Sequence, residues 1–410
     1  MSHRFLLSLV VALLACGVAQ AQKLSAPTYA AEMASLDTRI TALQKRVAAH
    51  RNDWLIQQHL GAALLEKANL SGSVTDISRA DEVIRDAIAT APKGSGPLLL
   101  AAHFNFSVHR LRGASIFLDQ INARPLLQQD EALAIEVLRA DIAFQRGEYA
   151  EALDGYERCE AHMPILCSEK LMLYYAKTGR YAEAEALSDA ALNRIGDKDP
   201  HARAWVLLHS AIRRLDQQRY PEALTKLEEA NTAFPGWWLV REHMAEVLAL
   251  QGNDAAAITI YDEVIAQTGL PQYMDAQAEC YMRAGRSAEA TALFAKADAL
   301  WKEQLRLFPE SASGHALEHF MALNHDPAFV VKLAQENFSN RPGGDARVLL
   351  AKAYLSVGRP KDALAQVHAL LASPYRTVEG LEVALDTFKT VGDEKNAERI
   401  SAEVASEKSA

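Results

Sequence analysis

Apolar and polar positions follow the period of an α-helix along almost the whole chain. Apolar residues recur at three- and four-residue spacing, and no stretch shows the alternating pattern of a β-strand. Prolines divide this pattern at intervals of 32–39 residues, at Pro92, Pro125, Pro164, Pro200, Pro235, Pro271, Pro309, Pro342 and Pro374. Because a repeat of 20–50 residues is typical of stacked supersecondary units, the pattern predicts an all-α repeat array.

The segments share a signal for a tight turn between two helices. A glycine is followed five residues later by an alanine in six copies: Gly147 and Ala152, Gly179 and Ala184, Gly252 and Ala257, Gly285 and Ala290, Gly358 and Ala363, Gly392 and Ala397. Glycine adopts φ > 0 without steric cost, and alanine lets the second helix pack closely against the first. We therefore predict about ten helical hairpins over residues 53–410.

These segments resemble the tetratricopeptide repeat, in which L-G-x-x-Y, A-x-x-x-F and a proline follow one another over about 34 residues. The best copies are residues 139–164, 171–191, 278–297 and 350–370. The resemblance covers nearly all of the chain after its N-terminal segment. It implies a right-handed superhelical solenoid whose first helices line a concave surface that binds a protein or peptide, without a cofactor and without catalysis.

The N-terminus has the pattern of an export signal. Arg4 precedes a run from Phe5 to Ala15 that is apolar except for Ser8 and is too short to span a bilayer. We predict a signal peptide over residues 1–21, cleaved after Ala21, and a periplasmic or secreted bacterial protein. The alternative is a lipobox that ends at Cys16, which would make the chain a lipid-anchored architectural lipoprotein of the inner or outer membrane.

Residues 22–52 are predicted to form a helix that caps the first hairpin. Their apolar residues are spaced three and four apart, at Met33, Leu36, Ile40, Leu43 and Val47. This spacing also fits a coiled-coil seam, so both interpretations stay open.

Charge and composition narrow the class of partner. Half of the residues are hydrophobic and 23% are charged, which excludes a disordered chain. The net charge is −9, and phosphate binding needs a positive surface, so we expect no nucleic-acid partner.

Two cysteines lie close together in the sequence. Cys159 and Cys167 flank one predicted helix–helix turn. In an oxidising compartment they would form a disulfide, and otherwise they would be two buried thiols.

One segment carries a pattern of catalytic type. His315, Glu318 and His319 form H-x-x-E-H, which resembles the zinc motif of inverted-motif metalloproteases. A metal-dependent hydrolase is therefore an alternative function. However, those proteases need an α/β core, which this all-helical pattern lacks.

The favoured site is a row of charged residues on the concave surface. The repeat projects titratable side chains there in pairs four residues apart: Glu242 and Glu246, Asp275 and Glu279, His315 and His319. Carboxylates beside imidazoles would hold a basic peptide or, as a weaker alternative, a metal ion. A solvated acidic helix face would explain the carboxylates equally well.

The histidine pair depends on the register of its hairpin. In one register His315 and His319 continue the acidic row. Shifted by one residue, the helix turns Ala316, Leu317 and Phe320 inward and places both histidines in the seam between hairpins.

Tryptophans near the starts of first helices have two interpretations as well. Trp205, Trp237 and Trp238 either anchor a ligand or wedge neighbouring repeats together.

Overall fold

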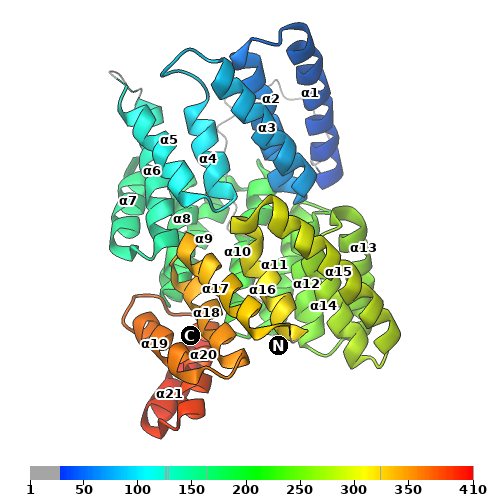
Figure 1. Cartoon of the computed structure of the whole chain (residues 1–410), viewed down its shortest axis with the longest axis vertical. Helices are drawn as coiled ribbons and strands as arrows, with labels where there is room; N and C mark the ends of the chain where they lie inside the picture. The colour runs from blue at the N-terminus through cyan, green and yellow to red at the C-terminus, as the bar shows by residue number, and fades with distance from the viewer. Residues whose placement is uncertain (1–27, 125–126, 128, 163, 324, 410) are drawn as a thin grey trace.

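The computed structural model describes residues 28–124, 127, 129–162, 164–323 and 325–409, and this part of the chain is built from helices and short turns. Helix α1 (Tyr29–Ala49) is followed by ten helical hairpins (Figure 1). The predicted all-α array of about ten hairpins is thereby confirmed. The predicted signal peptide and Cys16 lie outside the described residues.

Each hairpin consists of a first and a second helix joined by a tight turn. The first helices are α2 (Trp54–Ser71), α4 (Leu98–Ser107), α6 (Gln129–Arg146), α8 (Pro164–Lys177), α10 (Pro200–Asp216), α12 (Trp238–Leu250), α14 (Pro271–Arg283), α16 (Pro309–Ala322), α18 (Gly344–Ser356) and α20 (Val378–Val391). The second helices are α3 (Val74–Thr90), α5 (Leu111–Asn122), α7 (Tyr149–His162), α9 (Tyr181–Ile195), α11 (Tyr220–Ala233), α13 (Asp254–Thr268), α15 (Ser287–Leu307), α17 (Pro327–Asn340), α19 (Pro360–Leu371) and α21 (Glu394–Ser409).

The first helices form the inner layer of the solenoid. Each of them contacts the second helix of its own hairpin, and each from α2 to α18 also contacts the first helix of the next hairpin. Elements on the inside of a curved array approach one another more closely than those outside. The first helices therefore line the concave side, as the resemblance implies.

The hairpin turns have the backbone geometry that the glycines predict. All six glycines of the repeated signal have positive φ, between 72° and 81°. Two hairpins place another residue at the equivalent turn, His109 with φ 59° and Gln218 with φ 60°. Side chains rarely adopt this conformation without compensating contacts, and both residues bond to distant helices. His109 Nε2 lies 3.1 Å from an Arg341 nitrogen, and Gln218 donates to Glu382 at 2.9 Å.

The solenoid coils back onto itself, so that hairpins far apart in the sequence touch. The Tyr149 hydroxyl accepts a hydrogen bond of 2.7 Å from the Gly344 amide, and Lys177 lies 2.7 Å from an Asp345 oxygen. The Arg376 amide donates to the Lys177 carbonyl at 2.9 Å, and residues of α16 to α20 share one apolar cluster with residues of α6 to α8. We call these meetings of early hairpin turns with later helices the closure contacts.

The N-terminal hairpin also takes part in the closure contacts. Helix α2 ends at Gly72, whose φ is 70°, and a Cβ there would lie 2.9 Å from Leu270. The Trp238 indole donates a hydrogen bond of 2.8 Å to the Leu70 carbonyl. Trp238 is 2% exposed and Trp237 is equally buried. These tryptophans therefore wedge repeats together.

Helix α1 packs within the chain. It contacts α2, and its residues Leu36 and Ile40 are buried. Met33, Leu43 and Val47 pack against the same apolar clusters. The apolar stripe thus packs against apolar residues of the same chain.

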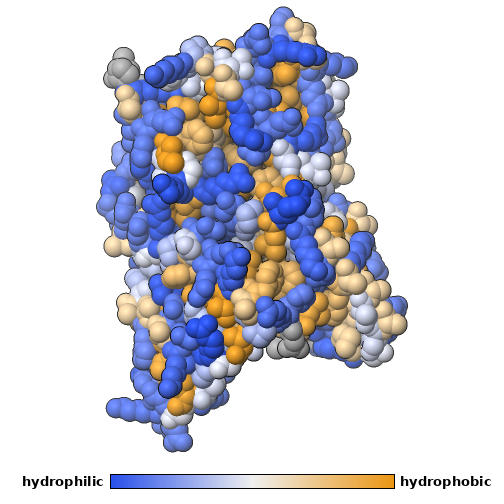
Figure 2. Space-filling model, viewed as in Figure 1, coloured by the Kyte–Doolittle hydropathy of each residue, from blue (hydrophilic) through white to orange (hydrophobic). Residues whose placement is uncertain are grey.

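The outer surface is mainly hydrophilic. Figure 2 shows polar residues over most of one face, with apolar residues between the helices. Amphipathic helices that bury one stripe produce this distribution. Among the described residues, no helix combines the length and the apolar character that a bilayer crossing requires.

Candidate binding site

A cavity of about 60 Å³ lies between the inner helices α12, α14 and α16. Its wall contains charged and aromatic side chains from three consecutive hairpins: Glu242, His243 and Glu246 of α12, Tyr273 and Asp275 of α14, Trp301 of α15, and His315, Glu318 and His319 of α16. Five of the six predicted groove residues therefore line one cavity. The sixth, Glu279, lies one turn beyond Asp275 on α14 and is not part of the wall.

Helix α12 supplies a cluster of two carboxylates and one imidazole. The His243 ring lies between them, with Nε2 3.2 Å from Glu242 Oε1 and Nδ1 3.2 Å from Glu246 Oε2. Burial and repulsion from Glu246 raise the pKa of Glu242 to about 8, although His243 opposes this shift. Burial would lower the pKa of His243, but the two glutamates raise it to about 9.

His243 is not among the residues that the four-residue spacing predicts. It directly follows Glu242 and precedes Glu246 by three. A helix turns 100° per residue, so residues at i, i+1 and i+4 share a broad face. The i, i+3 spacing of His243 and Glu246 is the signal that could have identified it.

The acidic row is buried, so the expectation of a solvated helix face is wrong. Glu242 and Glu246 are each 8% exposed, and Asp275 is 6% exposed. The first helices pack closely enough on the inner side to remove these carboxylates from bulk water. Buried carboxylates need hydrogen-bond or charge partners, so each of them must be accounted for.

Asp275 has partners on both carboxylate oxygens. The Trp301 indole donates to Oδ2 at 2.7 Å, and His319 Nδ1 lies 2.7 Å from Oδ1. These bonds join α14 to α15 and α16. Asp275 therefore holds the cavity wall in place, and its lone pairs are already engaged.

Glu246 differs from Asp275 because one of its oxygens has no partner. Oε2 faces His243, whereas Oε1 is buried and makes no hydrogen bond in the structure. A desolvated carboxylate oxygen is unfavourable unless a donor or cation meets it. Glu246 is thus the acceptor that the cavity offers to a ligand.

Helix α16 combines the two predicted registers. Ala316, Leu317 and Phe320 are buried in the core, as the shifted register predicts. His315 and His319 nevertheless line the cavity, and the His315 ring lies parallel to Trp301 with centroids 6.4 Å apart. Burial and the Arg341 charge lower the pKa of His315 to about 4.

The H-x-x-E-H segment does not form a zinc site of the protease type. His319 bonds to Asp275, and Glu318 lies 3.0 Å from the Lys352 ammonium. Within the described ranges, the titratable ligand atoms that are close enough to hold one ion belong to Glu242, His243 and Glu246. That group contains neither histidine of the segment.

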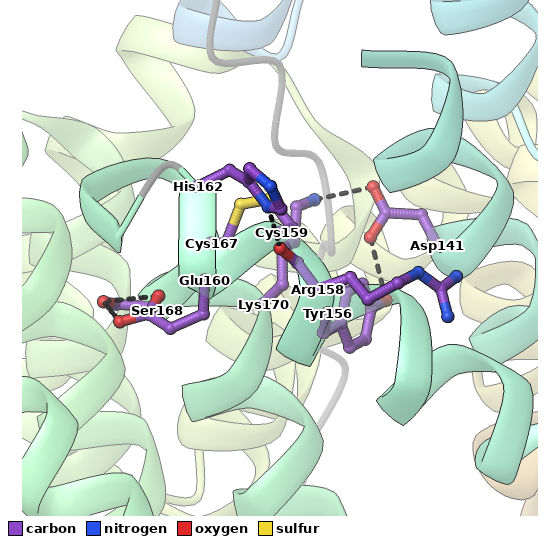
Figure 3. Close-up of a disulfide and its surroundings, with 9 residues drawn as sticks. All are labelled: Asp141, Tyr156, Arg158, Cys159, Glu160, His162, Cys167, Ser168 and Lys170. Carbon is purple, nitrogen blue, oxygen red and sulfur yellow. Dashed lines mark hydrogen bonds and ion pairs between the residues drawn. A yellow bond between two sulfur atoms is a disulfide. The ribbon is translucent and has the colours of Figure 1, made fainter. Parts of the chain in front are cut away.

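The structure joins Cys159 and Cys167 in a disulfide between α7 and α8 (Figure 3). Both cysteines are fully buried, and their Cα atoms are 5.7 Å apart. Beside them Asp141 accepts from the Tyr156 hydroxyl and from Lys170, each at 2.8 Å (Figure 3). The bridge and this buried ion pair fix the junction of two hairpins. Cys280 is a buried free thiol.

Comparison with known proteins supports the repeat. Residues 210–273 match the family model of the tetratricopeptide repeat. This segment is similar to tetratricopeptide repeats. It contains α11, α12 and α13, and so includes the first helix that carries Glu242, His243 and Glu246.

One curated relative extends the similarity over more of the chain. Tetratricopeptide repeat protein 21B of Mus musculus is 24% identical over 309 residues, which cover 73% of this chain. The match spans 20% of the mouse protein, so this chain corresponds to about a fifth of that relative.

Two solved structures share part of the course of this chain. A thermophilic tetratricopeptide repeat protein of Thermus thermophilus shares 19% identity and a TM-score of 0.37 over 46% of this chain and 98% of its own. The APC/C hetero-tetramer Cut9–Hcn1 shares 12% identity and a TM-score of 0.43 over 93% of this chain and 80% of its own.

Proposed function

We propose that the chain is a non-catalytic scaffold that binds a protein or peptide segment through a basic side chain placed in the α12–α14–α16 cavity. The observation that carries the proposal is the buried Glu246 Oε1, which has no hydrogen-bond partner and belongs to the cavity wall. An ammonium or guanidinium group would donate a hydrogen bond to this oxygen.

The other walls suit the same kind of ligand. Glu242 adds a second carboxylate, while Tyr273 and Trp301 offer aromatic surface. Cations bind favourably beside aromatic rings, and more so when both are desolvated. A volume of about 60 Å³ corresponds to roughly two water molecules, which is the scale of a side-chain head group and not of a folded element.

We further propose that the chain is exported to the bacterial cell envelope. The apolar run from Phe5 to Ala15 and the small-x-small sequence before Gln22 support a cleaved signal peptide. A disulfide between Cys159 and Cys167 is compatible with the oxidising periplasm. Acylation of Cys16, detected by mass spectrometry of the N-terminal peptide, would instead make the scaffold a lipoprotein.

Peptide binding tests the site directly. Fluorescence anisotropy of the full chain should show binding of labelled peptides rich in lysine and arginine and no binding of peptides with glutamate in their place. Glu246→Gln should weaken binding roughly tenfold or more, because it removes the charge that meets the cation. Glu279→Gln on the neighbouring helix is the matched control. Equal affinity of both variants would overturn the site assignment.

A further inference from the structure

The Glu242, His243 and Glu246 cluster has the donor set of a metal site. One imidazole and two carboxylates are ligands that Zn²⁺ and other divalent transition-metal ions accept. All three side chains come from adjacent turns of α12, so one rigid element positions them. A site on a helix holds its ligands more firmly than a site on loops.

The ligand atoms are already close to coordination distance. One atom from each residue lies within 4.8 Å of the others. Zn²⁺ holds nitrogen and oxygen ligands at about 2.0–2.2 Å, so tetrahedral ligand atoms are roughly 3.4 Å apart. The two carboxylates now face different nitrogens of the His243 ring, so the side chains must rotate to gather around an ion bound to one of these nitrogens.

Charge and hydrogen bonding both leave room for a cation. The two carboxylates are nine-tenths buried, and Glu246 Oε1 has no partner. A divalent ion that displaces the protons of its ligands, and so binds neutral His243 and two ionised glutamates, forms a complex without net charge. A metal ion in this position would therefore meet the unpartnered Glu246 Oε1 and compensate the charge of the buried carboxylates.

The neighbouring cavity gives the ion a route and a further ligand. All three residues lie on the cavity wall, and the volume of about 60 Å³ accommodates a water molecule. Catalytic and exchangeable zinc sites commonly have three protein ligands and a water in the fourth position. The cluster likewise offers three protein ligands beside a cavity that accommodates water.

We propose that Glu242, His243 and Glu246 bind one divalent transition-metal ion, with Zn²⁺ as the best match and water from the cavity as the fourth ligand. The metal site does not depend on the proposed peptide function. Because both ligands would use Glu246, Zn²⁺ and a basic peptide should compete.

Metal analysis of the full chain, produced without a histidine tag, tests the site. After chelator treatment and dialysis against Zn²⁺, one ion per chain should remain. Co²⁺ in its place should give the visible absorption of a four- or five-coordinate ion, and added Zn²⁺ should abolish it. His243→Gln and Glu246→Gln should each weaken Zn²⁺ binding roughly tenfold or more.

The control is Glu279→Gln, which alters an acid of the same inner layer outside the cavity. Circular dichroism establishes that each variant is folded. If a variant does not fold, the Co²⁺ spectrum of the unaltered chain still decides, because octahedral Co²⁺ in solution absorbs much more weakly. Failure to retain stoichiometric Zn²⁺, or equal retention by His243→Gln and Glu279→Gln, would overturn the proposal and leave the peptide function untouched.

Discussion

Asp275 Oδ1 and His319 Nδ1 lie 2.7 Å apart, although the two residues are separated by 44 positions in the sequence. Their contact joins the inner helices of two hairpins and fixes one wall of the cavity. With the Trp301 indole on its other oxygen, Asp275 connects three helices. The cavity shape therefore depends on a buried carboxylate and not on apolar packing alone.

Removal of that carboxylate should destabilise the array. Asp275→Ala leaves the Trp301 N–H and the His319 ring without their acceptor, at about 1–3 kcal/mol for each orphaned group. Asp275→Asn keeps an acceptor and should cost less. The urea unfolding midpoint measures both, with Glu279→Ala as a control on the same helix. A midpoint for Asp275→Ala equal to that of the control would show that the connection is unimportant.

Alanine substitutions at two turn glycines distinguish the effect of the closure contacts on stability from the effect of backbone strain in the turn. Gly147 and Gly285 have nearly the same φ, 78° and 75°, but a Cβ at Gly147 would lie 3.2 Å from the Pro342 carbonyl, whereas Gly285 faces open space. Gly285→Ala should cost about 1–2 kcal/mol from backbone strain alone. Gly147→Ala should cost about 1 kcal/mol more, because the hairpin turn is pushed away from the later helices. Equal losses on thermal unfolding would argue against closure in solution.

His103 should make the fold sensitive to acid. Burial, together with the Lys170 charge, lowers its pKa to about 4, while Asp141 acts in the opposite direction. In the unfolded chain a histidine titrates near 6.5, so below that pH the unfolded state binds a proton that the folded state refuses. The stability contribution is present above pH 6.5 and is lost as the pH falls toward 4.

The measurement is the free energy of unfolding at pH 7.5 and at pH 4.5. His103→Gln should reduce the loss between these two values by on the order of 1–3 kcal/mol. His59→Gln, at an exposed position, should leave the loss unchanged. A His103→Gln profile that superimposes on that of the unaltered chain would contradict the lowered pKa of His103.

The disulfide between Cys159 and Cys167 can be tested by counting free thiols. In protein isolated from an oxidising compartment, alkylation of the unfolded chain should modify two more thiols after reduction than before, because Cys159 and Cys167 are released. Reduction should destabilise the folded chain by about 2–3 kcal/mol, as expected for a short closed loop. An equal number of modified thiols with and without reductant would show that the bridge does not form.

Local sequence signals determined most of what could be predicted. The six turn glycines predicted the hairpins because each one adopts a positive φ, without steric cost, in a turn of only a few residues. The pairs Glu242 with Glu246 and His315 with His319 could be placed on inner faces because helical spacing and the repeat fix a direction. Five of the six projected residues consequently meet in one cavity.

The repeat pattern could not predict contacts between hairpins that are far apart in the sequence. Self-comparison shows how one hairpin contacts the next, but not that Trp238 meets Leu70 or that Tyr149 meets Gly344. These closure contacts depend on the pitch of the whole superhelix, which accumulates from small rotations at each hairpin. The burial of Glu246 has the same origin, because it depends on how closely three inner helices approach.

Site-directed photo-cross-linking tests the location of the binding site most directly. A photoreactive amino acid in place of Gln272, which lines the cavity and is half-buried, should form adducts with a bound lysine-rich peptide. The same group at Ile116, which is 48% exposed on a second helix, should not. The account predicts adducts from position 272 that disappear when Glu246→Gln is added. Adducts of equal yield from both positions, or adducts that survive Glu246→Gln, would contradict it.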